Sequence, residues 1–191
     1  MIPALHRGSA LAVVRAMIRH FVALFFASVL AGCAGMKEPA RQTPIAKVDI
    51  LPLALDDDFA FTKVSPFFND PHDANAMKTS QNAMIQFEKQ RVNYGAVSGY
   101  DRAERYGYYY NVWWRSRRAA DITVRFEYRQ ENLGSHVQAK ETFYAAAKGG
   151  IETRFNVIGD EYANDGKVTA WRLLLIENNR IVGLRQSFLW N

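Results

Sequence analysis

Few side chains in this sequence have the type and spacing that catalysis or metal binding needs. Two acidic clusters stand out, namely Asp56-Asp57-Asp58 and the stretch GDEYANDG with Asp160, Glu161, Asn164 and Asp165. Carboxylate oxygens suit calcium, but neither cluster has the spaced acidic positions and the distant glutamate of a calcium-binding loop. Turn-forming chemistry accounts for both clusters. We therefore predict no metal site and no bound cofactor.

Histidines are too few for most hydrolytic chemistry. After residue 32 the sequence contains only His72 and His136, which falls short of a histidine zinc site and gives little basis for a Ser-His-Asp triad. The stretch GAVSG places its serine one position away from the nucleophile motif G-x-S-x-G. An enzyme would therefore depend on carboxylates such as Asp160 and Glu161.

A stretch rich in aromatic residues and arginines is the better candidate for binding. Tyrosines and tryptophans crowd residues 100–114, and three arginines follow at once. If this stretch is a β-strand, alternate side chains point to opposite faces, so Tyr109 and Trp113 point away from the core. Either an early helix covers them, or they form an exposed strip that contacts sugar rings, lipid headgroups or another protein. The candidate binding residues are Tyr109, Trp113, Arg115, Arg117 and Arg118.

The single cysteine of the chain, Cys33, ends a short apolar run. Residues 21–31 carry no charge, arginines precede them, and no acidic residue occurs before Glu38. A basic region followed by a short apolar one is typical of a secretory leader. Because a transmembrane helix needs roughly 20 apolar residues, this run predicts a leader and not a membrane span.

The tetrapeptide Leu30-Ala31-Gly32-Cys33 resembles the lipobox of bacterial lipoproteins. The resemblance implies that a diacylglycerol joins the sulfur of Cys33, that a peptidase cuts between Gly32 and Cys33, and that the new amino terminus is commonly acylated. It also implies a protein anchored in the bacterial cell envelope and facing the periplasm. Residue 34 is alanine, and not the aspartate that tends to retain such proteins at the inner membrane, so the outer membrane is favoured.

These features divide the chain into three parts. Residues 1–32 are the predicted signal peptide, with Met17 as an alternative start, and residues 33–44 form a lipidated tether. Residues 45–191 have the length of a single domain. Three arginines and no acidic residue leave with the leader, so the formal charge falls from +5 to +2. This near-neutral charge argues against a nucleic-acid partner.

The domain is expected to be mainly β with one helix. Asp70 and Pro71 form a helix start signal. Three- and four-residue steps then place one stripe of residues on a helix, namely Met77, Ser80, Met84, Phe87 and Arg91. This stripe predicts an amphipathic helix, packed on the domain, over about 71–92. From Tyr106 onward apolar residues alternate with a period of two, which predicts six consecutive strands joined by short turns, at 106–115, 121–130, 137–144, 151–158, 167–176 and 181–190. Residues 177–180 form a tight turn before the last strand, in which Val182, Leu184, Phe188 and Trp190 share a face. We therefore expect an antiparallel, Ig-like β-sandwich of about six to seven strands.

Three functions are compatible with this sequence. The first is a non-catalytic envelope lipoprotein that binds or scaffolds a partner protein of an envelope assembly. The second is a carbohydrate- or cell-wall-binding module that uses Tyr109, Trp113 and the arginines after them. The third is a hydrolase that works with carboxylates alone, and it requires a pocket around Asp160 and Glu161.

Overall fold

The computed structural model describes residues 41–46, 48–70 and 83–190. The predicted leader, Cys33, His72 and the predicted helix start at residue 71 lie outside the described residues, as does most of the tether.

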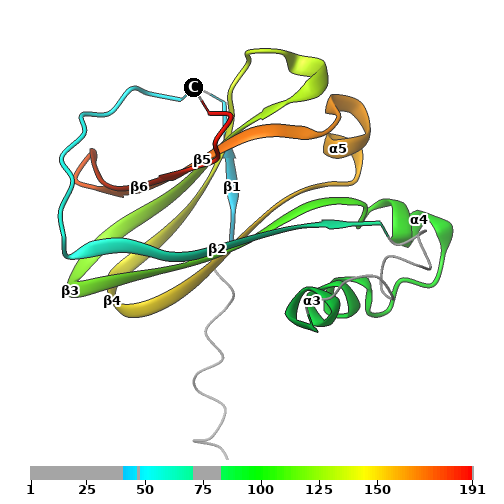
Figure 1. Cartoon of the computed structure of the whole chain (residues 1–191), viewed down its shortest axis with the longest axis horizontal. Helices are drawn as coiled ribbons and strands as arrows, with labels where there is room; N and C mark the ends of the chain where they lie inside the picture. The colour runs from blue at the N-terminus through cyan, green and yellow to red at the C-terminus, as the bar shows by residue number, and fades with distance from the viewer. Residues whose placement is uncertain (1–40, 47, 71–82, 191) are drawn as a thin grey trace, which may run out of the picture. The chain divides into compact units, whose positions relative to one another are not determined.

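Six antiparallel strands form one sheet in the described part of the chain (Figure 1). They are β1 (Thr43–Ile45), β2 (Phe59–Asn69), β3 (Gly107–Gln130), β4 (Gln138–Ile158), β5 (Val168–Glu177) and β6 (Arg180–Gln186). The central strand β3 pairs with β4 on one side, and on the other side with β2 over 107–116 and then with β5 over 123–130. β1 extends the sheet beyond β4, and β6 extends it beyond β5.

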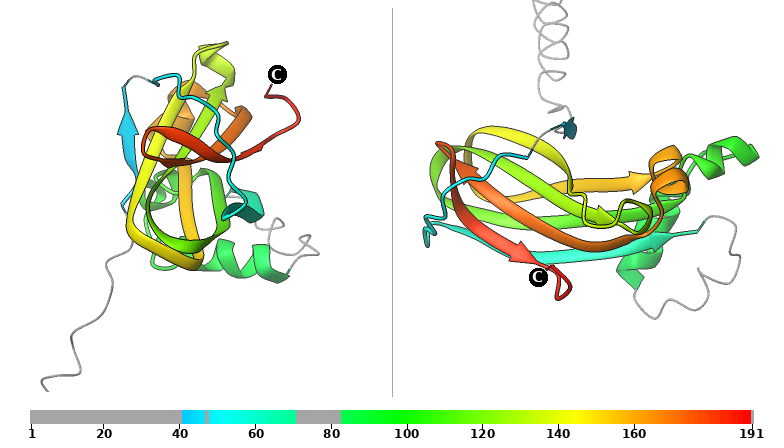
Figure 2. Two further views of the ribbon diagram at one scale, coloured as in Figure 1. Left: turned by 90° about the vertical axis from the view of Figure 1, so that its left-hand side faces the viewer. Right: turned by 90° about the horizontal axis from the view of Figure 1, so that it is seen from above.

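The long hairpin of β3 and β4 bends in its middle, so that its two halves face each other (Figure 2). The pairing register shifts between Ser116 and Ile122, and such bulges bend a strand. As a result, Phe126 in the second half of β3 lies 4.5 Å from Tyr110 in the first half, measured between ring centroids. The core fills the space between the halves and includes Phe59, Tyr110, Val112, Trp114, Ile122, Val124, Phe126, Tyr128, Phe155, Val157, Leu173, Leu175 and Val182.

The prediction of a mainly β, antiparallel fold is confirmed, but the strand count after residue 106 is corrected. The predicted strands at 106–115 and 121–130 are one strand, β3, and the two predicted on either side of residues 145–150 are β4. The segment between the first two has no glycine or proline to stop it, so the chain continues through a bulge. An Ig-like sandwich is not confirmed, because the strands belong to a single bent sheet that does not close.

Short helices connect the strands. They are α3 (Ala83–Asn93), α4 (Gly99–Ala103), the 3₁₀ turn η2 (Glu131–Leu133) and α5 (Asp160–Asp165). Helix α3 confirms the later part of the predicted helix and extends to Asn93. The predicted stripe is wrong at Phe87, which is 62% exposed, whereas Glu88 is buried. Glu88 accepts two hydrogen bonds from Arg91, at 2.9 and 2.7 Å, so α3 turns a paired charge toward the domain.

The last hairpin confirms one prediction and corrects another. Asn178 and Asn179 have φ values of 48° and 59°, in the left-handed region that a two-residue turn between β5 and β6 requires. This is the tight turn predicted for residues 177–180. The final strand is shorter than predicted, since β6 ends at Gln186. Leu184 and Phe188 are exposed, although the alternation placed them with Val182 and Trp190 in the core.

Candidate functional site

Tyr109, the first ring of the predicted aromatic strip, is buried in the domain. Tyr109 is only 9% exposed, its ring stacks on Phe67 with centroids 5.1 Å apart, and its hydroxyl donates to Arg105 O at 3.0 Å. Burial raises the pKa of Tyr109 to about 12. Tyr109 therefore cannot belong to an exposed strip.

The other predicted members of the strip differ from one another in exposure and in the residues they contact. Trp113 is half-buried, with Lys63 Nζ 5.1 Å from its ring centroid. Arg115 and Arg117 are exposed, while Arg118 is held by carboxylates. One half-buried ring and two exposed arginines are what remains for binding at this place.

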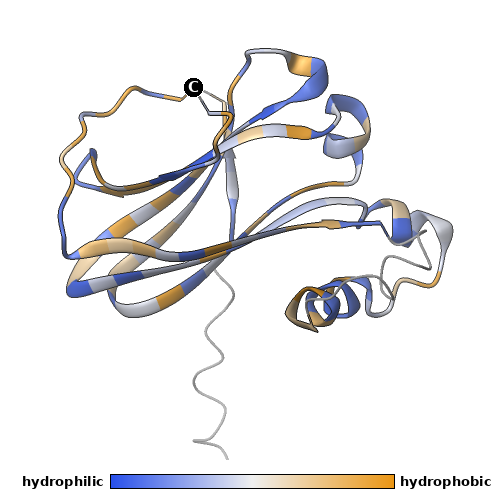
Figure 3. Ribbon diagram, viewed as in Figure 1, coloured by the Kyte–Doolittle hydropathy of each residue, from blue (hydrophilic) through white to orange (hydrophobic). Residues whose placement is uncertain are grey.

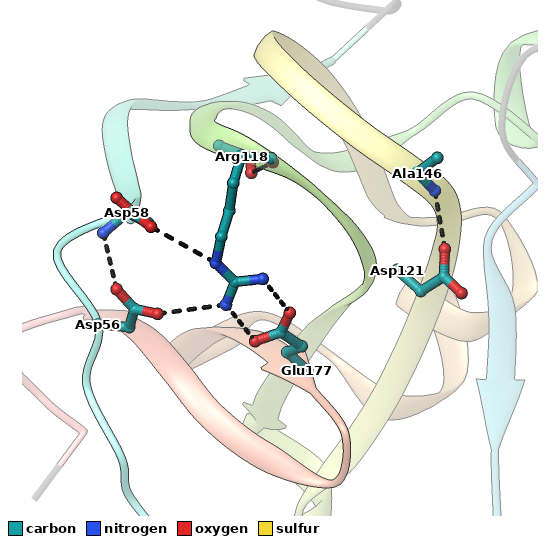
Figure 4. A network of polar contacts seen from close by, with 7 residues as sticks. Asp56, Asp58, Arg118, Asp121, Ala146 and Glu177 are labelled. Atoms are coloured by element: carbon teal, nitrogen blue, oxygen red, sulfur yellow. Dashed lines mark hydrogen bonds and ion pairs between the residues drawn. The ribbon is translucent and has the colours of Figure 1, made fainter.

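Arg118 is the centre of an ion cluster at the bend of β3 (Figure 4). Its guanidinium donates to both oxygens of Glu177 at 2.6 Å and to Asp56 Oδ2 at 3.3 Å, and its Nε lies 3.4 Å from Asp58 Oδ2. Hydrogen bonding to Glu177 raises the pKa of Arg118. A hydrogen bond from the backbone N–H of Asp58 lowers the pKa of Asp56, and a hydrogen bond from Arg118 lowers it further. Two of the three aspartates of the first acidic cluster are thus partners of Arg118.

This ion cluster fixes the segment that precedes β2 against β6. Ala54 N donates to Ile181 O at 2.9 Å, Ile181 N donates to Pro52 O at 2.9 Å, and Asp56 N donates to Val182 O at 3.1 Å. The segment therefore covers the outer edge of β6, and a cavity of about 420 Å³ lies beside it. Because the segment is rigidly paired, its outward side chains are held in fixed positions.

Those outward side chains are large and apolar. Ile50, Leu53 and Leu55 are 101, 60 and 64% exposed, and we call them the edge surface. Leu184 on β6, and Phe188 and Leu189 after it, are exposed as well. Figure 3 shows hydrophobic residues along this part of the ribbon. Large exposed apolar side chains that gather on one segment mark a place of interaction.

A cleft of about 740 Å³ lies where β1 and the start of β4 meet α5. At its base the Tyr128 hydroxyl donates to Glu161 Oε1, and Lys140 Nζ donates to Glu161 Oε2 at 2.6 Å and to Asn156 O at 2.6 Å. Burial, and then the hydrogen bond to Glu161, raises the pKa of Tyr128. His136, which is exposed, also lines the cleft.

One of the two predicted catalytic carboxylates, Glu161, lines this cleft. Glu161 and Asp165 line it, but both oxygens of Glu161 already accept hydrogen bonds. This arrangement favours a role for Glu161 in joining α5 to the sheet. Nothing in the residue spacing pointed to Lys140 as its partner, because the two residues meet only when the hairpin bends.

A second exposed apolar surface lies around α3 and α4. Phe87, Tyr94, Val97 and Tyr100 are 62, 87, 81 and 73% exposed, and we call them the helix-tip surface. The connection between the two helices is well braced. Arg105 Nη1 donates to Val92 O at 3.0 Å and to Tyr94 O at 2.7 Å, and Ser98 and Asp101 form a capping box at the start of α4.

Comparisons with known proteins leave the chain's family open. No family model matches the chain, and neither a curated protein nor a solved structure matches it. Within residues 41–46, 48–70 and 83–190, no cluster of histidine, cysteine and acidic side chains could hold a metal ion. Over the same residues, no helix has the length and hydrophobicity that crossing a membrane would take.

Proposed function

We propose that this chain is a lipid-anchored protein of the bacterial cell envelope that binds a partner protein without catalysing a reaction. The anchor is Cys33, and the mature domain faces the periplasm, with the outer membrane as its site. The domain holds the partner near the membrane as part of an envelope assembly.

The edge surface carries the proposal. Ile50, Leu53 and Leu55 expose most of their apolar area on a segment that hydrogen bonds fix to β6. Displaying such residues to water is costly, since each apolar side chain gains roughly 1.5–3 kcal/mol when it is fully buried. A rigid apolar segment on a sheet edge suits a protein partner, because little ordering is needed when it binds.

The cleft and the ion cluster support a structural use of the polar groups. Glu161 is bound by Tyr128 and Lys140, and Arg118 is bound by carboxylates. These side chains hold segments of the chain together, which supports a binding scaffold over the carboxylate hydrolase.

Site-specific photo-crosslinking in intact cells tests the partner. A benzophenone amino acid replaces Leu55, and the same group at Phe143 is the matched control because Phe143 is also exposed. We expect a crosslinked protein product from position 55 and none from position 143. Adding Leu53→Asp should abolish the product without lowering the Tm.

The anchor is tested separately by metabolic labelling with an alkynyl fatty acid. Wild-type protein should take up the label, and the Cys33→Ser variant should not. Absence of crosslinks at position 55, together with sedimentation on cell-wall material that Trp113→Ala abolishes, would overturn the protein-binding function in favour of the glycan-binding one.

A further inference from the structure

The two exposed apolar surfaces lie at opposite ends of β2 (Figure 1). The segment with the edge surface leads into β2 at Phe59, and β2 ends at Asn69. Asn69 Nδ2 donates to Asn93 Oδ1 at 3.0 Å and to Arg105 O at 2.8 Å, which places the α3 and α4 region at that end. A strand of 11 residues separates its ends by about 33 Å, at roughly 3.3 Å per residue.

The chain enters the domain along β1, which lies midway along the sheet (Figure 1), and a series of contacts leads from there to the helix tip. The side chain of Gln42 is bonded to Asn156, with Nε2 donating to Oδ1 at 2.7 Å. Asn156 pairs with Tyr109 across the sheet, and the Tyr109 hydroxyl donates to Arg105 O. Arg105 in turn binds the carbonyl of Tyr94. Four successive contacts therefore connect the entry point to the helix-tip surface.

The tether is too short to let the start of the domain move far from its anchor. Arg41 follows Cys33 by eight positions, and a fully extended chain spans at most about 28 Å over eight steps of roughly 3.5 Å. If Cys33 carries lipid, Arg41 stays within that distance of the bilayer, and the contacts that begin at the neighbouring Gln42 link it to the helix tip. A surface held so close meets the membrane at a high effective concentration, so weak contacts are sufficient.

The chemistry of the helix tip suits the boundary between headgroups and acyl chains. Tyr94 and Tyr100 combine an apolar ring with a polar hydroxyl, which is the side-chain type enriched at membrane interfaces. Val97 lies between them in sequence, and Arg102 is exposed beside them. A lipid chain and a protein surface together give the two signals that stable anchoring requires.

We propose that the helix-tip surface, Phe87, Tyr94, Val97 and Tyr100, contacts the phospholipid bilayer that holds the anchor of the same chain. This inference rests on the lipid anchor of the proposed function. It orients the domain with the helix tip in the headgroup layer and the edge surface turned away from the membrane, where a partner can reach it.

Fluorescence quenching in reconstituted vesicles tests the contact. Full-length Val97→Cys protein, processed in cells, is labelled with a nitrobenzoxadiazole dye and placed in vesicles of phosphatidylethanolamine and phosphatidylglycerol that include lipids with a nitroxide on the acyl chain. The chain has one native cysteine, and its sulfur is blocked when lipidated, so the introduced thiol takes the dye. Lys148→Cys is the control, since Lys148 is exposed in the middle of β4, where the hairpin bends away from the helix tip. Tyr100→Cys provides a second reporter if Val97→Cys fails to fold.

The outcomes separate the contact from the anchor. We expect several-fold stronger quenching at position 97 than at position 148. Equal, weak quenching at both positions in protein that floats with the vesicles would overturn the bilayer contact and leave the anchor standing, with water or another protein at the helix tip. Protein that does not float, and whose wild type takes the dye at Cys33, would overturn both.

Discussion

Gln42 and Asn156, which are 114 positions apart, exchange two hydrogen bonds: Gln42 Nε2 donates to Asn156 Oδ1 at 2.7 Å, and Asn156 N donates to Gln42 Oε1 at 3.3 Å. Lys140 adds a bond to Asn156 O at 2.6 Å. The two halves of β4 come together at this point. The backbone of Asn156 pairs with β3 on one side, and on its other side, where no described strand pairs with it, the side chains of Gln42 and Lys140 form its hydrogen bonds. The start of the domain is thereby fixed to the open side of the bent sheet.

Replacing Gln42 with alanine should loosen this edge. Gln42→Ala removes both bonds to Asn156, and each hydrogen bond contributes about 0.5–1.5 kcal/mol. We expect the free energy of unfolding in urea to fall by about 1–2 kcal/mol and amide exchange at Asn156 to speed up. Thr43→Ala is the control, because Thr43 is exposed. Equal stability of both variants would show that the edge closes without Gln42.

Removing Lys140 should destabilise the domain more strongly. The side chains of Lys140 and Glu161 are 10 and 26% exposed, and breaking one partner of a buried pair costs about 3–5 kcal/mol. Lys140→Met should therefore lower the free energy of unfolding by about 3 kcal/mol. Adding Glu161→Gln should recover part of the loss, since no unpaired charge remains. The geometry indicates that Lys140 and Glu161 are energetically coupled, and additive effects of the two changes in a double-mutant cycle would contradict this.

Alternation along the strands was readable from the sequence, and the bend was not. Ile122, Val124 and Phe126 alternate with polar residues and are all buried, because each half of β3 has one face on the core. The continuity of β3 through Arg117 and Arg118 depends on contacts with β4 and with Asp56 that form only after folding. A local pattern therefore predicts strands here but cannot tell a bulge from a turn.

The candidate sites were predictable to a smaller degree. The position of Tyr109 on the second face followed from its parity, but its burial depends on Phe67, which comes from another strand. The edge and helix-tip surfaces carry no motif, since Leu53 and Val97 look like core residues in the sequence. They are exposed because of where the fold places them: Leu53 lies on the segment outside β6, and Val97 lies in the connection between α3 and α4.

The ring of Phe126 should contribute one of the largest packing terms. It is fully buried and contacts Tyr110, Tyr128 and Phe155. Truncation of a buried phenylalanine to alanine costs about 3–5 kcal/mol, so Phe126→Ala should strongly lower the Tm measured by circular dichroism. Phe143→Ala is the matched control, because Phe143 is 60% exposed. A similar loss in both variants would mean that the halves of β3 do not pack on each other.

The buried hydroxyl of Tyr109 should make stability fall in alkali. Burial raises its pKa from 10.0 to about 12, so the folded state holds the proton that the unfolded state releases. This contribution is complete below the unfolded pKa and is lost as the pH rises through the folded one.

Comparison of wild type with Tyr109→Phe isolates this effect from that of the other tyrosines. At neutral pH the variant should be less stable by about 1 kcal/mol, since it lacks the bond to Arg105 O. Between about pH 9 and pH 11 the wild type should lose about 1 kcal/mol more than the variant, because each pKa unit corresponds to about 1.4 kcal/mol. Urea unfolding at each pH measures both values, with Tyr94→Phe as the exposed control. A constant difference between wild type and Tyr109→Phe across this range would place the Tyr109 hydroxyl in contact with water.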